Sequence, residues 1–147
     1  MQEMKNLNGK TRAARILKTA VDFHGHLGPY LVLGLKMGDL AVGRLKCRRH
    51  FGVKAVVYGA FNRPKSCLID GIQVSSGCTY GKGNIEKKPG REIRAIFYNL
   101  RNRKKIIIRL KKDLVDRLEN LGGHNDSEAL AGELLRAGPA EAFELKP

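Results

Sequence analysis

Aromatic residues and long hydrophobic runs are scarce in this chain. It has no tryptophan, and aromatic residues make up 6% of its 147 positions, so few side chains are available to stack on nucleic-acid bases. The longest apolar runs, at residues 30–35 and 106–108, fall far short of the roughly 20 residues that a membrane-spanning helix needs. A signal sequence is also not expected, because residues 1–10 are polar. We therefore expect a cytoplasmic protein with no membrane segment.

Cysteine is also sparse, with Cys47, Cys67 and Cys78 as the only three. An odd number of cysteines argues against a disulfide framework and for reduced thiols. A chain of this length buries roughly 70% of its unfolded surface without disulfides. No linker, repeat or low-complexity tract divides the sequence. We expect one domain over residues 1–147, with a core at about 11–112 and C-terminal helices at about 111–138.

Acidic residues are few relative to basic ones: 14 Asp and Glu face 28 Lys and Arg, which gives a net charge of +14. The positive charge gathers at residues 44–50 and 101–112. Such clusters attract phosphates, nucleic acid or acidic partners, although runs of charge are often only solvated faces. A basic module that binds nucleic acid or an acidic partner is therefore an alternative function.

Helical spacing dominates the first third of the chain. Thr11 can cap a helix that runs to His24, because apolar residues recur there every three or four positions. A second helix is predicted from Pro29 to about Cys47. Its three glycines, Gly34, Gly38 and Gly43, weaken its intrinsic stability. We expect this helix to be buried against a close neighbour.

The rest of the chain mixes strands and helices, which predicts an α+β fold. Strands are expected at 53–61, 93–100 and 104–110, the last two antiparallel. A short helix at 67–74 is followed by a glycine-rich loop at 77–84. A helix at 111–121 and a last helix ending at 138 should close the chain. Asn125 and Glu128 resemble the capping box of that last helix.

Four side chains with metal-binding or nucleophilic chemistry lie at breaks between these elements. In an extended segment, His24 and His26 would point the same way, and Gly25 between them leaves room. Cys67 and Cys78 flank the short helix. Two imidazoles with two thiolates suit zinc, but the spacing alone is weak. A hydrogen-bonded histidine at a helix end and a buried, apolar cysteine are the structural alternatives.

The glycine-rich segment GCTYGKGN at 77–84 is not a phosphate-binding P-loop. Three residues separate Gly77 from Gly81, where the P-loop motif requires four. Gly83 also follows Lys82 in the position of the required Ser or Thr. A simpler interpretation is that the glycines of this loop let Cys78 and Thr79 come close to a site.

Four segments together resemble the FmdE family, which is named after a component of formylmethanofuran dehydrogenase. They are FHGHLGP at 23–29, GLKMG at 34–38, CLIDGIQV at 67–74 and GCTYGKGN at 77–84. The combination and order are far more specific than any one motif. The resemblance implies two N-terminal helices packed on a mixed sheet, often in a homodimer, with a helical C-terminus.

The resemblance also implies a pocket lined by histidine and cysteine that serves as a metal or active site. The metal ligands would be His24, His26, Cys67 and Cys78, holding zinc or another divalent transition metal. Asp70, Thr79 and Lys82 would handle protons or donate hydrogen bonds beside it. The implied role is an accessory or stand-alone relative of the archaeal dehydrogenase of one-carbon, methanogenesis-type metabolism, with a larger oxidoreductase complex as a partner. Whether the chain is itself an enzyme stays open.

Two departures from the family pattern are visible. No cysteine follows Cys78, so we do not expect the C-terminal zinc finger of some members. Gly28 stands where the family commonly has cysteine, so one thiolate is absent from the expected ligand set.

Overall fold

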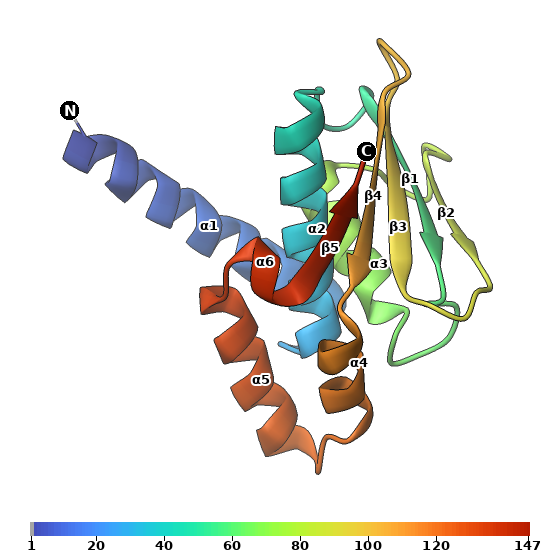
Figure 1. Cartoon of the computed structure of the whole chain (residues 1–147). Coiled ribbons are helices and arrows are strands. Elements are labelled where there is room, and N and C mark those ends of the chain that lie inside the picture. The colour runs from blue at the N-terminus through green and yellow to red at the C-terminus, as the bar shows by residue number, and fades with distance from the viewer. Residues whose placement is uncertain (1) are drawn as a thin grey trace.

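A five-stranded mixed sheet carries all the helices on one of its faces in this computed structural model (Figure 1). The structure describes the backbone of residues 2–147 and the side chains of residues 12–147. The helices are α1 (Gln2–His24), α2 (Pro29–Leu45), α3 (Cys67–Ser76), α4 (Lys112–Glu119), α5 (His124–Arg136) and α6 (Pro139–Ala142). The strands are β1 (Val53–Tyr58), β2 (Ile85–Lys88), β3 (Arg94–Asn99), β4 (Lys105–Leu110) and β5 (Phe143–Lys146). Among the described helices, none is both long and apolar enough to cross a membrane.

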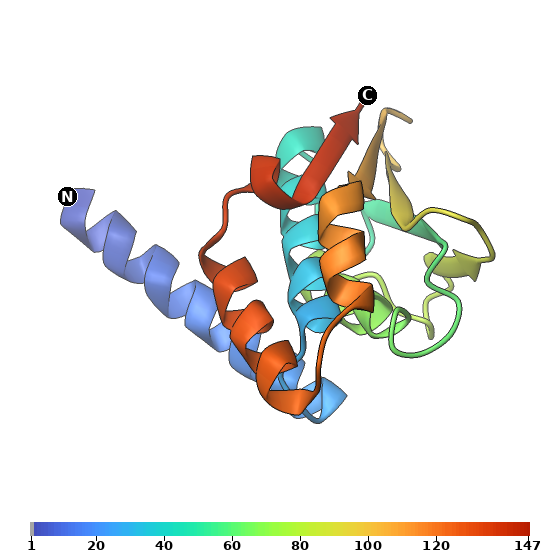
Figure 2. The same cartoon turned by 60° about the horizontal axis from the view of Figure 1, so that its bottom comes forward.

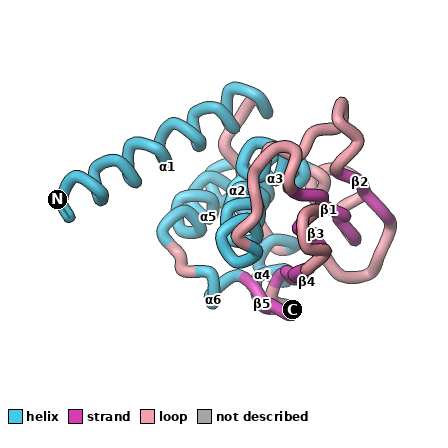
Figure 3. The backbone as a smooth tube through the Cα atoms, turned by 90° about the horizontal axis from the view of Figure 1, so that it is seen from above, coloured by secondary structure: helices cyan, strands magenta, loops and turns pink. Residues whose placement is uncertain are grey.

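The strand order in the sheet is β2-β1-β3-β4-β5. β1 and β2 are parallel and the other neighbours are antiparallel, so the predicted mixed sheet and the antiparallel β3–β4 pair are confirmed. Val57, Phe97 and Ile108 point to the helical side and are fully buried. The opposite face is covered by no described helix (Figure 3), which is common for a largely antiparallel sheet.

The core forms where α2 and α3 pack on the inner face of the sheet. Leu33 and Met37 of α2 meet Leu68 and Ile72 of α3 there, and all four are fully buried. A smaller cluster joins α1 to α2, because Ile16 and its neighbours on α1 pack around Leu31 and Leu35. Figure 2 shows the N-terminal part of α1 extending away from this body.

Two glycines let the backbones of α2 and α3 approach each other directly. A methyl group on Gly34 would overlap the Leu68 carbonyl, and one on Gly71 would overlap the Leu31 carbonyl. The expectation that α2 is buried against a close neighbour is therefore confirmed, and α3 is that neighbour. Gly43, near the C-terminal end of α2, meets no atom within 4 Å and has no such role.

Several predicted boundaries are wrong. α1 begins at Gln2, so Thr11 lies inside it, because good helix formers such as Gln, Glu, Met and Lys precede it. α5 begins at His124 with Gly123 as its N-cap, which leaves Asn125 inside the helix. In place of the predicted capping box, the Asp126 carboxylate accepts a hydrogen bond from the Gly122 N–H at 3.1 Å.

The C-terminus is helical only in part. After α5 the chain forms the single turn of α6 and then returns to the sheet as β5, beside β4. Neither β5 nor β2 was predicted from the sequence. Both have only four residues, and exposed, charged side chains make up three of the four in β2 and two of the four in β5, so neither carries the β-branched pattern of a strand.

The close approach of α2 and α3 predicts that Gly34→Ala destabilises the protein. The added methyl group must separate two packed backbones, so the free energy of unfolding should fall by about 2 kcal/mol or more. Gly43→Ala, on the same helix, adds its methyl group in open space and should raise stability by up to about 1 kcal/mol. Urea unfolding followed by circular dichroism measures both. Equal midpoints for the two variants would contradict the packing argument.

Candidate metal site

Gly25 turns the chain between the two histidines of the HGH motif. His24 is the last residue of α1, and Gly25 follows with a φ of +107°, which favours glycine. The segment is therefore a turn, and the extended conformation assumed from the sequence is wrong. The turn nevertheless brings the two imidazoles together, with ring centroids 4.8 Å apart and planes tilted by 35°.

Asp70 orients the His24 ring. Nδ1 of His24 lies 2.6 Å from the Asp70 carboxylate, which α3 carries in its first turn. The His24 side chain is 10% exposed. With Nδ1–H donating to the carboxylate, the neutral ring carries a free lone pair on Nε2. This is the arrangement in which a histidine commonly binds a metal, with its other nitrogen held by a carboxylate.

Nε2 of His24 has no partner of its own. It is buried, and it forms no hydrogen bond with any described atom. A buried polar atom left in this state costs about 1–3 kcal/mol. The chemistry of this buried nitrogen therefore suits an electrophilic ligand such as a metal ion.

A cavity of about 240 Å³ lies beside these histidines. His24, His26 and Cys67 line one side of it, and Tyr30 of α2 contributes another wall. The far wall comes from the C-terminal region through Leu118, Leu121, His124 and Ser127. Motif reasoning missed this wall, and His124 in particular lies about a hundred residues from His24. The only hint in the sequence was the helix predicted for residues 111–121.

Burial controls the protonation of the two acidic groups on the cavity wall. It raises the pKa of the Cys67 thiol, and the negative charge of Asp70 raises it further. Burial, with the charge of Glu119, also raises the pKa of Tyr30 to about 12. Both side chains are therefore neutral near pH 7, so a metal ion that takes up Cys67 must displace its proton.

Gly28 leaves room that His26 fills. A Cβ atom on Gly28 would lie 3.2 Å from Nε2 of His26. The cysteine that the FmdE resemblance implies at this position would stand against the imidazole ring. With glycine at this position the site has no thiolate there, and the His26 ring lies beside the Gly28 backbone.

Cys78 does not join this cavity. Cys67 is the first residue of α3, whereas Cys78 follows the C-terminal end of that helix. The ten residues of α3 span about 15 Å, which places the two cysteines at opposite ends of the helix. Cys78 is fully buried, its thiol is 3.5 Å from the Val53 carbonyl oxygen, and burial raises its pKa. In this position it behaves as a small core residue.

Thr79 and Lys82 also lie at the far end of α3. Nζ of Lys82 donates to the Gly77 carbonyl at 2.7 Å and to the Thr79 hydroxyl at 2.9 Å. A cation beside the carbonyls of a helix C-terminus is favourable. These contacts hold the glycine-rich loop on α3, and neither residue reaches His24. Of the three predicted proton-handling residues, only Asp70 contacts a side chain that lines the cavity, that of His24.

The donors present meet some, but not all, requirements of a metal site. In residues 12–147, no three His, Cys, Asp or Glu side chains are grouped as a ready-made metal cluster. The orphaned Nε2 of His24, its carboxylate partner and the adjacent imidazole nevertheless fit a histidine-bound transition metal. Cys67 on the same cavity adds a ligand type that zinc prefers.

Comparison with known proteins places the chain in a family. The model of a family described as "FmdE, Molybdenum formylmethanofuran dehydrogenase operon" matches residues 23–142, which include the histidine turn, α3 and the C-terminal wall of the cavity. The chain belongs to the FmdE family. It is thus a protein related to formylmethanofuran dehydrogenase, as the motifs predicted.

Two relatives set the limits of this comparison. A protein of Archaeoglobus fulgidus, described as a probable S-adenosyl-L-methionine-binding protein, is 31% identical over 85 residues. The match takes in 53% of this chain but spans only 22% of that protein. A crystal structure of a tungsten formylmethanofuran dehydrogenase FmdE-like protein from Syntrophus aciditrophicus superposes with a TM-score of 0.68. It shares 24% identity, covers 91% of this chain and is itself covered to 70%, and it confirms the fold.

The burial of the cysteines predicts a large difference in thiol reactivity. Cys47 is half-buried and should react with a disulfide reagent in the native state, whereas Cys78 should react only after unfolding. Burial raises the pKa of Cys47, so its reaction should be slow at pH 7 and should accelerate as the pH rises. Stopped-flow absorbance with the reagent in excess, with and without urea, measures this. Native-state reaction of Cys78 as fast as that of Cys47 would contradict its assignment to the core.

Proposed function

We propose that this chain is an FmdE-like metal-binding protein that holds one divalent transition-metal ion, zinc being the first candidate. The observation that carries the proposal is the buried, unpartnered Nε2 of His24, whose ring is fixed by Asp70 through Nδ1. A carboxylate behind a histidine raises its basicity and fixes its orientation as a ligand. The Asp70 contact alone would also suit a structural histidine, but it leaves Nε2 buried with no hydrogen bond to any described atom.

The proposed ligands are Nε2 of His24, the imidazole of His26 and the thiolate of Cys67. Asp70 acts behind His24 and does not bind the ion. Three protein ligands leave one position of a tetrahedral zinc ion for water or a substrate. When bound there, zinc would supply a Lewis acid that activates that water or polarises a substrate oxygen. Cys78, Thr79 and Lys82 are left out of this ligand set, because α3 separates them from the cavity.

The cavity suits an ion with a small ligand better than a large cofactor. Its volume of about 240 Å³ lies below the range of roughly 300–1,000 Å³ that is usual for small-molecule sites. S-adenosyl-L-methionine, which the description of the Archaeoglobus protein names, would need more room. We therefore favour the metal site over a site for that cofactor.

The proposed setting is a cytoplasmic, one-domain protein that works beside formylmethanofuran dehydrogenase, as an accessory component or a stand-alone relative in methanogenesis-type metabolism. This setting is supported by the family's description and by the description of the Syntrophus structure. We also propose a homodimer, which light scattering on the purified protein would test.

The ligand set predicts which substitutions abolish metal binding. The wild-type chain, purified in the presence of zinc and dialysed, should retain about one ion per chain, and His24→Ala should retain none. Asp70→Asn should keep the site but weaken it by about 10–100-fold, since it acts behind a ligand. Mass spectrometry for metal content and a competitive chelator titration measure the two effects.

Two matched controls separate this site from the alternatives. Cys78→Ala should retain the ion, whereas a set of four ligands that included Cys78 would predict that this variant binds the ion more weakly. His50→Asn removes a histidine outside the cavity and should also retain the ion; asparagine suits the left-handed backbone at that position, where φ is +72°.

Cobalt substitution adds a spectroscopic test, because a thiolate-to-cobalt absorption band should vanish in Cys67→Ser. A metal-free wild type, or equal metal content in wild type and His24→Ala, would rule out the proposal.

A further inference from the structure

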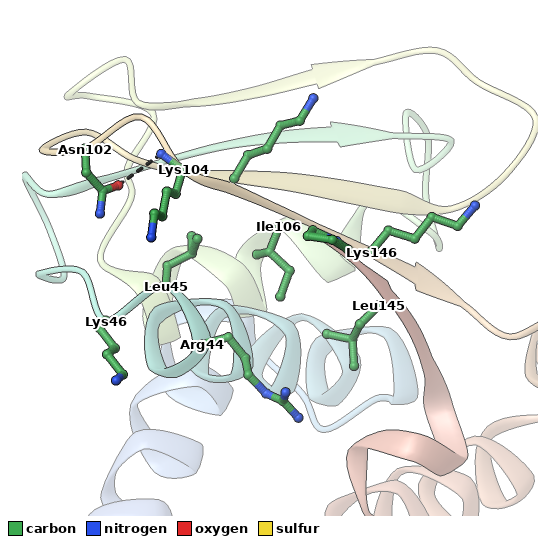
Figure 4. A pocket seen from close by; sticks show the side chains of 10 residues that line it. Arg44, Leu45, Lys46, Asn102, Lys104, Ile106, Leu145 and Lys146 are labelled. Carbon is green, nitrogen blue, oxygen red and sulfur yellow. Dashed lines mark hydrogen bonds between the residues drawn. The ribbon is translucent and has the colours of Figure 1, made fainter.

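A basic groove lies at the opposite end of α2 from the histidine cavity (Figure 4). It has a volume of about 660 Å³ and is bordered by the C-terminal end of α2, the β3–β4 turn and β5. Five cationic side chains line it: Arg44, Lys46, Lys104, Lys105 and Lys146. Residues from both basic clusters of the sequence therefore meet at one surface, although about sixty residues separate them along the chain.

No acidic side chain in residues 12–147 neutralises the charge of this groove. None of the five cations forms an ion pair with any described side chain, and no Asp or Glu lines the groove. Elsewhere the chain does pair its arginines, as Arg49 with Asp39 and Arg109 with Glu92 show. A hollow lined by one sign of charge focuses the electric field and concentrates ligands of the opposite sign.

The floor of the groove is aliphatic. Leu45, Ile106 and Leu145 line it between the cations, and Figure 4 shows their side chains between α2 and the strands. No aromatic side chain among the described residues lines the groove, so these residues offer no platform for stacking bases. A sugar-phosphate backbone would leave the aliphatic floor uncovered, whereas a polypeptide can fill it with aliphatic side chains.

The strand that borders the groove also has a free edge. β5 is the last strand in the order β2-β1-β3-β4-β5, and it pairs only with β4 among the described strands. An extended segment from another protein can add to such an edge through backbone hydrogen bonds, with side-chain pockets giving specificity. Lys146 and Leu145 on β5 provide one cation and one aliphatic contact for it.

We propose that this groove binds an extended, carboxylate-rich segment of a partner protein that also carries aliphatic side chains. The carboxylates meet the five cations at the rim, and the aliphatic side chains cover Leu45, Ile106 and Leu145. The 17 residues of α2 hold the groove about 25 Å from the histidine cavity. Docking therefore leaves that cavity open, and the inference does not depend on the metal proposal.

The test uses a fluorescein-labelled peptide of alternating glutamate and leucine, with anisotropy measured across a salt series. The peptide should bind at low salt and weaken as salt rises. The Lys104→Glu, Lys146→Glu double variant should weaken it by at least about tenfold. A Lys88→Glu, Lys112→Glu variant changes the net charge equally but at exposed lysines outside the groove, and should weaken it by less than about threefold.

Two further probes test the nature of the ligand. A glutamate–serine peptide of equal length and charge should bind more weakly, because it cannot cover the aliphatic floor. A labelled single-stranded oligothymidine should also bind more weakly than the glutamate–leucine peptide at the same salt. Lys104→Gln with Lys146→Gln serves as a milder second variant, and urea midpoints establish that every variant is folded.

Several outcomes would overturn the inference. Equal weakening by the groove and control variants would assign the attraction to diffuse charge. Equal binding of the two peptides would remove the aliphatic floor from recognition. Tighter binding of the oligothymidine, lost in the groove variant, would assign the surface to nucleic acid. Absence of peptide binding at low salt would rule out the docking site.

Discussion

The direct contact between the backbones of α2 and α3 is the constraint on which the site depends. Gly34 and Gly71 remove the side chains that would hold the two helices apart. The first turn of α3 is thereby held against the junction of α1 and α2. Asp70 then lies within hydrogen-bonding distance of His24, and Cys67 reaches the same cavity. A wider helix separation would lose the contact that leaves Nε2 of His24 as the free nitrogen.

Each end of α3 has a charged side chain whose sign is opposite to that of the helix dipole at that end. Asp70 lies in the first turn, where a carboxylate is favoured by the helix dipole, and Lys82 donates to the Gly77 carbonyl at the other end. Asp70 therefore both fits its helix and orients His24. Lys82, with Thr79, ties the glycine-rich loop to the same helix. The motif residues thus divide into a group at the cavity and a group that holds the loop, although the sequence presents them as one signature.

Apolar spacing and β-branched runs in the sequence predicted most helices and strands of the core, but they did not predict the strands that are only four residues long. The apolar spacing of α2 and the β-branched runs of β1, β3 and β4 identified these elements closely. β2 and β5 were not predicted because they are short, contain few β-branched residues, and are held as strands by their neighbours. Of the four predicted ligands, His24, His26 and Cys67 line one cavity, but Cys78 does not. Two cysteines flanking a helix look adjacent in sequence, but the length of the helix holds them apart.

The sequence by itself determined the family, the α+β class, the residue types available to a metal and the excess of positive charge. These depend on residue identity and local spacing, which the chain carries directly. Only the tertiary structure decided which donors meet, that His24 keeps one nitrogen free, that C-terminal residues wall the cavity and that two distant basic clusters border one groove. These depend on how helices and strands pack, because packing alone brings together residues that lie about a hundred positions apart.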